Sequence, residues 1–136
     1  MNKFNIVLDT NILLVAISPR SPYHWIFDAF INEKFNLCVT TDILLEYEEI
    51  ISKHMGKKLA DTILQIIENA INVKLITNYF NWNIIKLDYD DNKFVDCAIA
   101  CNAHYLATND KHFNILKTIE FPKVNIININ ELKTIL

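Results

Sequence analysis

The sequence predicts an α/β domain built around a mostly parallel sheet of five strands. Short apolar runs of strand length alternate along the chain with longer segments of helical periodicity, as in strands joined by crossover helices. The 136 residues are 51% hydrophobic, which is enough to fill the core of one compact domain. No repeat, low-complexity tract or linker interrupts the pattern, so we expect a single domain over residues 1–136.

The predicted strands are apolar runs of strand length, and they lie at Phe4–Leu8, Phe35–Val39, Val73–Ile76, Tyr105–Ala107 and Val124–Asn128. Ser21-Pro22, an N-cap residue followed by proline, predicts the start of the first long amphipathic helix. Thr41 is expected to cap the next helix, which ends near Gly56 and forms a hairpin with a helix from Lys57 to Asn72. A last helix, Glu131 to Leu136, is expected to cover a sheet edge.

Composition narrows the classes of protein to consider. No apolar stretch approaches the roughly 20 residues of a membrane span, and no signal peptide precedes the first strand, so we expect a soluble cytoplasmic protein with no membrane partner. Cys38, Cys97 and Cys101 are an odd number of cysteines in apolar surroundings and are expected to be reduced. The net charge of −3 gives no support for a broad electrostatic grip on nucleic acid, so any such binding must be local or metal-assisted.

Basic residues gather in two short clusters, one from Lys53 to Lys58 and one at Lys111 and His112. Each cluster taken alone is expected to be a solvated helix end. The four histidines share no spacing that suggests a catalytic set, so all four are expected to be structural or exposed.

Two aspartates follow predicted strands. Asp9 ends the first strand, where it could cap the following helix through the amides of Asn11 and Ile12, and Asp110 lies just past a later strand. Ligands bind at the carboxyl ends of the strands in parallel α/β sheets, so two carboxylates at this edge indicate a site.

Three further acids complete the candidate set. Glu46 lies close to the apolar side of its helix, whereas Glu48 and Glu49 fall on the solvated side. Asp91 lies in an acidic segment at a helix start, where negative charge is favourable in any case. Asp96 stands among apolar residues, where an unpaired charge is costly, so it must face solvent or be compensated.

Together these five acids form an all-oxygen set without matched histidine or cysteine partners. Such a set suits Mg²⁺ or Mn²⁺ and argues against zinc. A magnesium-type site of this kind activates water and stabilises charge on an attacked phosphate, which predicts phosphodiester hydrolysis. The predicted metal ligands and catalytic residues are Asp9, Glu46, Asp91, Asp96 and Asp110.

The order and context of these acids resemble the PIN domain, a family of metal-dependent nucleases with a parallel sheet sandwiched by helices. Four segments carry the resemblance: Val7-Leu8-Asp9-Thr10-Asn11-Ile12-Leu13, Leu45-Glu46-Tyr47, Asp90-Asp91-Asn92-Lys93-Phe94-Val95-Asp96-Cys97-Ala98 and Ala107-Thr108-Asn109-Asp110-Lys111-His112-Phe113. The resemblance implies a three-layer α/β/α sandwich. It also implies that Thr10, Asn11 and Thr108 support the acids, with Thr108 contacting phosphate or orienting the site.

The resemblance further implies cleavage of single-stranded RNA, leaving a 5′-phosphate, by the toxin of a toxin–antitoxin pair, with a small antitoxin protein as partner. Homodimerisation is a further expectation. Within the third segment the ligand is Asp91, Asp96 or both, because a spacing of five residues separates them by roughly 140° on a regular helix. We favour Asp91 as a direct ligand and Asp96 as a direct or water-mediated one. The competing hypothesis is a catalytically inactive PIN-like module that binds RNA or protein, and such a module should have lost some of these acids.

Overall fold

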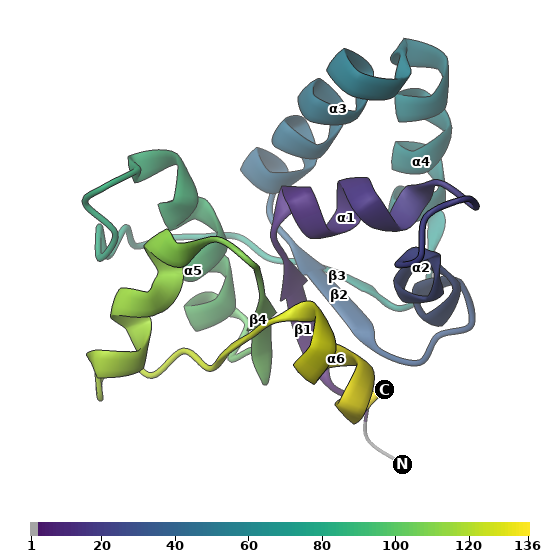
Figure 1. The fold of residues 1–136 in the computed structure, drawn as a ribbon. Coiled ribbons are helices and arrows are strands. Elements are labelled where there is room, and N and C mark those ends of the chain that lie inside the picture. The colour runs from purple at the N-terminus through teal and green to yellow at the C-terminus, as the bar shows by residue number, and fades with distance from the viewer. Residues whose placement is uncertain (1–2) are drawn as a thin grey trace.

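The computed structural model describes residues 3–136, whose five strands form one sheet in which every neighbouring pair is parallel. The strand order is β3-β2-β1-β4-β5, and Figure 1 labels the first four of these strands. The strands are β1 (Asn5–Leu8), β2 (Asn36–Val39), β3 (Val73–Leu75), β4 (Tyr105–Ala107) and β5 (Ile126–Ile127). The predicted sheet is therefore confirmed, with β4 at its predicted bounds and the other four strands shorter than predicted.

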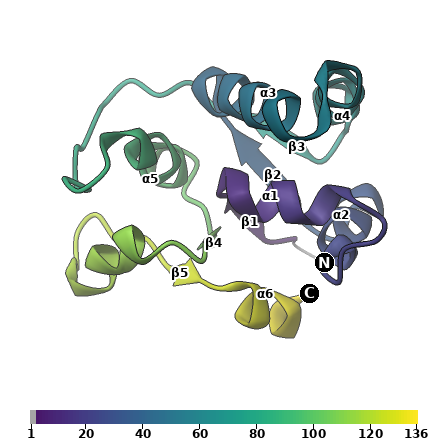
Figure 2. The same ribbon diagram turned by 45° about the horizontal axis from the view of Figure 1, so that its top comes forward.

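Helices lie on both faces of this sheet. They are α1 (Thr10–Ile17), α2 (His24–Ile31), α3 (Thr41–Met55), α4 (Lys57–Asn69), α5 (Asn92–Ala100) and α6 (Ile129–Ile135), with the 3₁₀ helices η1 (Tyr89–Asp91) and η2 (Lys111–Thr118). Right-handed crossovers toward the β3 edge place α1 to α4 on one face, and those toward the β5 edge place α5 and η2 on the other. Helix α1 packs against α2 and α3, α3 packs against α4, and α5 packs on β1, β2 and β4 (Figure 2). This is the predicted α/β/α sandwich.

Two predicted helix starts are wrong by a few residues. Helix α2 begins at His24 because Ser21 is used in a turn, where its hydroxyl accepts a hydrogen bond from the Tyr23 amide at 3.1 Å. The cap of α3 is Thr40 rather than Thr41, since the extended Thr40 directs its hydroxyl to the Ile43 amide, at 3.2 Å. Local sequence did not distinguish these adjacent threonines.

The end of α4 also differs from prediction. The helix stops at Asn69 instead of Asn72, because the Asn72 amide group is buried and donates to the carbonyls of Phe30 and Phe35, each at 2.9 Å. Asn72 therefore ties the start of β3 to the connection between α2 and β2. At the C-terminus, α6 begins at Ile129, earlier than predicted, after an Asn128 capping box, and it packs on β5.

The predicted thiol state is consistent with the structure. Cys38 and Cys97 are buried, Cys101 is partly buried, and all three are free. Over residues 3–136, no helix combines the length and apolar character needed to cross a membrane.

Replacing Asn72 by alanine is expected to destabilise the fold. The variant removes the Asn72 donor from both carbonyls. The Phe30 carbonyl keeps the Glu33 amide at 3.0 Å, whereas the Phe35 carbonyl loses its side-chain donor, and an unsatisfied buried group costs about 1–3 kcal/mol. Urea unfolding of Asn72→Ala beside Asn69→Ala, an exposed helix position, measures the loss. Equal midpoints for the two variants would show that Asn72 does not hold this connection.

Candidate functional site

The site is built at the carboxyl ends of the two central strands. Leu8 of β1 pairs with Ala107 of β4, so the next residues, Asp9 and Thr108, lie beside each other at the sheet edge. The Asp9 amide donates to the Ala107 carbonyl at 3.0 Å. Both Asp9 and Thr108 are buried, so their polar groups need partners within the protein.

The Asp9 carboxylate belongs to this edge and does not cap α1. The Thr108 hydroxyl donates to Asp9 Oδ2 at 2.8 Å, whereas the amide of Ile12 bonds to the Asp9 backbone carbonyl. The side-chain cap considered from the sequence is therefore absent. The Thr108 hydroxyl oxygen also accepts from the Asp110 amide at 3.0 Å, so one side chain links Asp9 to Asp110.

The environment of Asp9 makes its negative charge costly. Burial is the main cause that raises the pKa of Asp9, and the hydrogen bond from Thr108 opposes it. The negative charges of Asp110 and Glu46 raise the pKa further, which shows that these carboxylates lie close to Asp9.

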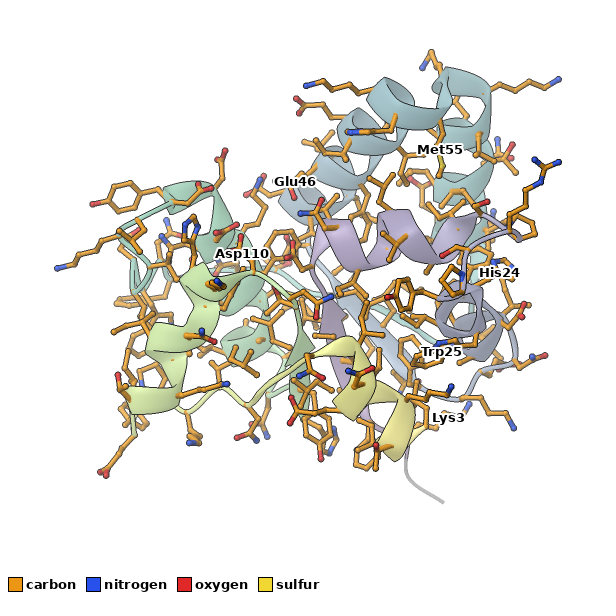
Figure 3. All side chains as sticks on the ribbon, viewed as in Figure 1. Lys3, His24, Trp25, Glu46, Met55 and Asp110 are labelled. Carbon is orange, nitrogen blue, oxygen red and sulfur yellow. The ribbon has the colours of Figure 1, made fainter. Side chains whose placement is uncertain are left out.

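Glu46 reaches the same region from α3, as the sequence predicted, and its side chain is only 20% exposed. Its carboxylate accepts hydrogen bonds from the Thr10 hydroxyl and, at 2.9 Å, from Lys93 Nζ. Thr10 therefore supports Glu46 through its hydroxyl, and its backbone amide also hydrogen-bonds the Asp9 carboxylate. Figure 3 shows Glu46 on α3 and Asp110 at the start of η2, on the same side of the molecule.

Lys93 is a site residue that the sequence analysis missed. Burial alone would lower the pKa of Lys93, but the hydrogen bond and the charge of Glu46 outweigh it and the pKa is raised. The ammonium group therefore stays charged and offsets the carboxylate of Glu46. Lys93 lies within the third motif segment. Its partner Glu46 is 47 residues away in the sequence, so no local pattern predicts the contact between them.

Asp91 joins the group from the end of η1, where it precedes α5. Burial, followed by the charges of Asp88, Asp110 and Asp9, raises its pKa to about 6, against a lowering by His112. His112 Nδ1 lies 3.4 Å from Asp91 Oδ2 and 3.5 Å from Asp110 Oδ1. In the part of the chain that the structure describes, Asp88, Asp91 and His112 offer ligand atoms within 4.8 Å of one another.

His112 is partly exposed, as expected, and it also lies beside the acids, which the sequence did not indicate. The Asp110 side chain accepts from the His112 amide at 2.9 Å, an Asx-type turn that brings the imidazole back beside the acids. The Asp-x-His spacing was the available signal. Its presence also means that the cluster is not made of oxygen ligands alone.

The structure does not bring Asp96 together with the other acids. Its carboxylate is buried on α5, accepts from the Trp82 amide at 3.1 Å and is also hydrogen-bonded by Asn78. Burial raises the pKa of Asp96, and these two hydrogen bonds lower it, with no contribution from Asp9 or Asp110. The 3₁₀ turn before α5 leaves Asp91 and Asp96 on different sides of the helix, as their spacing of five residues suggests. Asp96 therefore faces the connection between β3 and α5.

The remaining predicted residues lie at the mouth of the site. Asn11 is exposed on the first turn of α1 and lines a hollow together with Asp9 and Asp110. Asn109 points elsewhere, since its side chain accepts from the Ile129 amide at 3.4 Å. This geometry agrees with the Thr-x-Asp spacing, which selected Asp110 over its neighbour.

The arrangement can hold a divalent cation. Four carboxylates, Asp9, Glu46, Asp91 and Asp110, gather beyond β1 and β4, and only Glu46 has a lysine partner among the described residues. Carboxylate oxygens are the donors that Mg²⁺ and Mn²⁺ prefer, and His112 adds a nitrogen donor at the rim. The donor set therefore fits a hard divalent ion.

These features define a class of protein: a parallel α/β domain with acidic side chains gathered beyond the carboxyl ends of its central strands. The chain belongs to the PIN domain family, whose profile matches residues 5–112. The matched region runs from β1 to His112 and includes all five predicted acids. No curated protein sequence matches this chain.

Solved structures share the fold at low sequence identity. VapBC2 from Rickettsia felis, bound to a DNA fragment from its promoter, is 20% identical with a TM-score of 0.64, over 91% of this chain and 98% of that chain. VapC20 from Mycobacterium tuberculosis, a sarcin-ricin loop cleaving toxin, is 11% identical with a TM-score of 0.60, over 80% and 92%. The PIN domain endonuclease Utp24 is 17% identical with a TM-score of 0.52, over 91% and 84%.

Divalent cations are expected to stabilise wild-type protein and not Asp9→Asn. A ligand that binds only the folded state at 100 times its Kd adds about 2.7 kcal/mol. In chelator, Asp9→Asn is expected to be at least as stable as wild type, because the amide removes a buried charge that Asp110 and Glu46 repel. Thermal unfolding with Mg²⁺, Mn²⁺ or chelator tests this, with Asp61→Asn on exposed α4 as the control for charge. An equal rise for both variants would contradict a cation site at Asp9.

Replacing Asp96 by alanine is expected to loosen the connection from β3 without removing the cation response. Hydrogen exchange at the Trp82 amide should accelerate because its acceptor is lost. The Ile85 amide should remain protected by the Asn92 side chain, which accepts from it at 2.8 Å, and so provides an internal control. A lost Mg²⁺ or Mn²⁺ stabilisation in Asp96→Ala would instead make Asp96 a ligand.

Proposed function

We propose that this protein is a metal-dependent endoribonuclease that hydrolyses phosphodiester bonds of single-stranded RNA with Mg²⁺ or Mn²⁺. The observation that carries the proposal is the cluster of Asp9, Glu46, Asp91 and Asp110, in which neighbouring charges raise the pKa of Asp9 and Asp91. Such carboxylates repel each other unless a cation is bound, so the cluster is costly without a ligand. Membership of the PIN domain family and the likeness to the endonuclease Utp24 support nuclease chemistry.

We assign the ligand role to these four acids. A divalent ion held by them would supply positive charge next to a phosphate and would help to activate a water for attack. Thr108 orients Asp9 and Asp110 through its two hydrogen bonds, and Thr10 and Lys93 fix the Glu46 carboxylate. We assign Asp96 a positioning role, because its carboxylate anchors the Trp82 amide and not the cluster.

The substrate side of the site is open. Asn11 is exposed beside Asp9 and Asp110, so its amide group can hydrogen-bond a nucleotide that reaches the acids. His112, 41% exposed at its side chain, stands at the rim between Asp91 and Asp110 and can hydrogen-bond a phosphate or transfer a proton there.

We further propose that the protein is the toxin of a type II toxin–antitoxin pair. VapC20 is a toxin that cleaves the sarcin-ricin loop, and VapBC2 is a similar structure bound to promoter DNA. The proposed partners are therefore single-stranded RNA and a cognate antitoxin protein, with a homodimer as the proposed assembly and the cytoplasm as the proposed location. The alternative of an inactive module is disfavoured because all the acids that such a module should lose are present.

Purified protein is expected to cut a mixed pool of single-stranded RNA only when Mg²⁺ or Mn²⁺ is present. Asp9→Asn should lower the rate by more than about 100-fold, since it removes a carboxylate ligand while keeping the acceptor for Thr108. Asp61→Asn should cut like wild type. If wild type and Asp9→Asn gave the same products at the same rate in every condition, the nuclease would not reside at this site.

A further inference from the structure

The short helix η2 leads directly away from the acid cluster and carries a row of polar side chains. A 3₁₀ helix has three residues per turn, so side chains three apart lie above one another. In η2 this places Lys111, Asn114 and Lys117 in one row, which begins immediately after Asp110. Phe113 and Leu116 are buried and attach the helix to the core, which holds the row in place.

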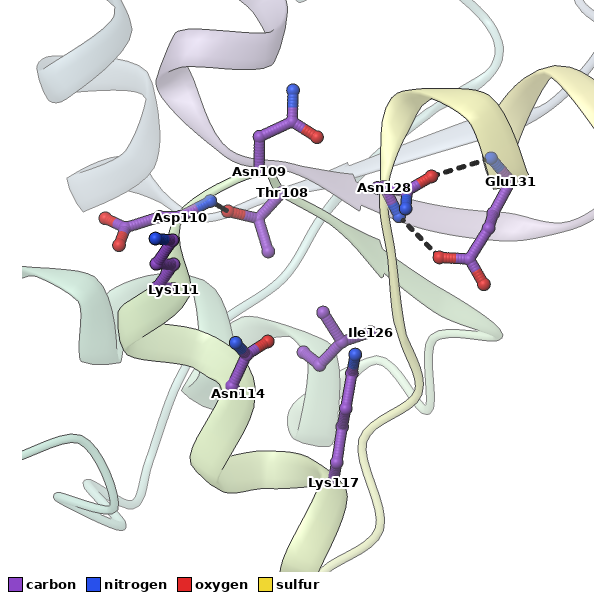
Figure 4. A pocket seen from close by; sticks show the side chains of 9 residues that line it. All are labelled: Thr108, Asn109, Asp110, Lys111, Asn114, Lys117, Ile126, Asn128 and Glu131. Carbon is purple, nitrogen blue, oxygen red and sulfur yellow. Dashed lines mark hydrogen bonds between the residues drawn. The ribbon is translucent and has the colours of Figure 1, made fainter.

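This row forms one wall of a surface hollow of about 250 Å³ next to the candidate site (Figure 4). Thr108 and Asp110 line the end of the hollow nearest the acids, and Asn128 and Glu131 line the opposite wall. The hollow is thus continuous with the site through Asp110, which lines both.

The two lysines of the row are free to meet an anion. Both are exposed, and neither forms an ion pair within residues 3–136. Two carboxylates also line the hollow and keep their negative charge, since Asp110 accepts from the His112 amide and Glu131 accepts from the Asn128 amide at 3.1 Å within the capping box. The hollow therefore places two mobile ammonium groups in a protein whose net charge is −3.

We propose that Lys111 and Lys117 bind two different backbone phosphates of the RNA strand that leaves the acid cluster, with the Asn114 amide bonding a nucleotide between them. This inference rests on the proposed function and adds the path of the substrate. A rise of about 2 Å per residue separates the two lysines by roughly 12 Å along η2, so they reach different phosphates. Such a local contact would allow a protein without a net positive charge to bind the RNA backbone.

The salt dependence of RNA binding tests the row. Wild type in chelator, which prevents metal-dependent cleavage, is titrated with a labelled uridine oligonucleotide long enough to span η2. Each phosphate contact contributes about 0.7 to the slope of log affinity against log salt for a single strand, so Lys111→Gln/Lys117→Gln should reduce the slope by about 1.4. Lys53→Gln/Lys58→Gln, in the other basic cluster, carries the same charge change and should leave the slope unchanged. Lys111→Arg/Lys117→Arg should retain the wild-type slope.

The proposed RNA contact is overturned if Lys111→Gln/Lys117→Gln keeps the wild-type slope. It is also overturned if both double variants lose the same amount of slope, because net charge alone would then explain the loss.

A cleavage assay distinguishes failure of this contact from failure of the proposed function. If wild type cuts RNA with Mg²⁺ or Mn²⁺ while the row variants bind normally, the nuclease stands and the row fails. If wild type never cuts but the slope falls as expected, the row stands as an RNA contact and the nuclease fails. Unchanged thermal midpoints show that the exposed substitutions leave the fold intact.

Discussion

The hydrogen bond from Thr108 to Asp9 is the contact on which the site depends. It joins residues 99 positions apart, and it exists because β1 and β4 are parallel neighbours whose ends are in register. The same hydroxyl accepts the Asp110 amide, so the position of one carboxylate fixes the backbone that carries another. A shift of one residue in this strand pair would turn Asp9 or Thr108 to the other face of the sheet and separate the acids.

The acids are held by neutral groups more than by opposite charges. Asp9 and Glu46 each accept a hydrogen bond from a threonine hydroxyl, and Asp110 and Asp96 each accept one from a backbone amide. These donors orient the carboxylates without neutralising them, so the charge remains available for a cation. Lys93 is the exception, and its pairing with Glu46 leaves the negative potential concentrated at Asp9, Asp91 and Asp110.

The sequence predicted the sheet and the strand-end positions of Asp9 and Asp110, because these depend on local periodicity or on the end of an apolar run, and the resemblance to the PIN domain implied the sandwich. It failed where two local choices were equivalent, as for Thr40 and Thr41, and where a distant partner decided the outcome. Asn72 lies outside the helix predicted for it, because its side chain donates to two carbonyls of the connection between α2 and β2. The Asp96 carboxylate accepts from the Trp82 amide in the segment before α5. His112 and Lys93 were missed because their importance lies in tertiary contacts.

The order of the site residues along the chain has a consequence for translation. Asp9 and Glu46 are made early, but Asp91, Thr108 and Asp110 follow only after most of the chain, and β1 cannot gain its β4 neighbour before then. A nascent chain therefore leaves the ribosome with half of its acids and no register to hold them, since non-local pairing must await the later strand. If the protein is the nuclease we propose, a polypeptide interrupted before β4 lacks the strand pair that positions Asp9 beside Asp110.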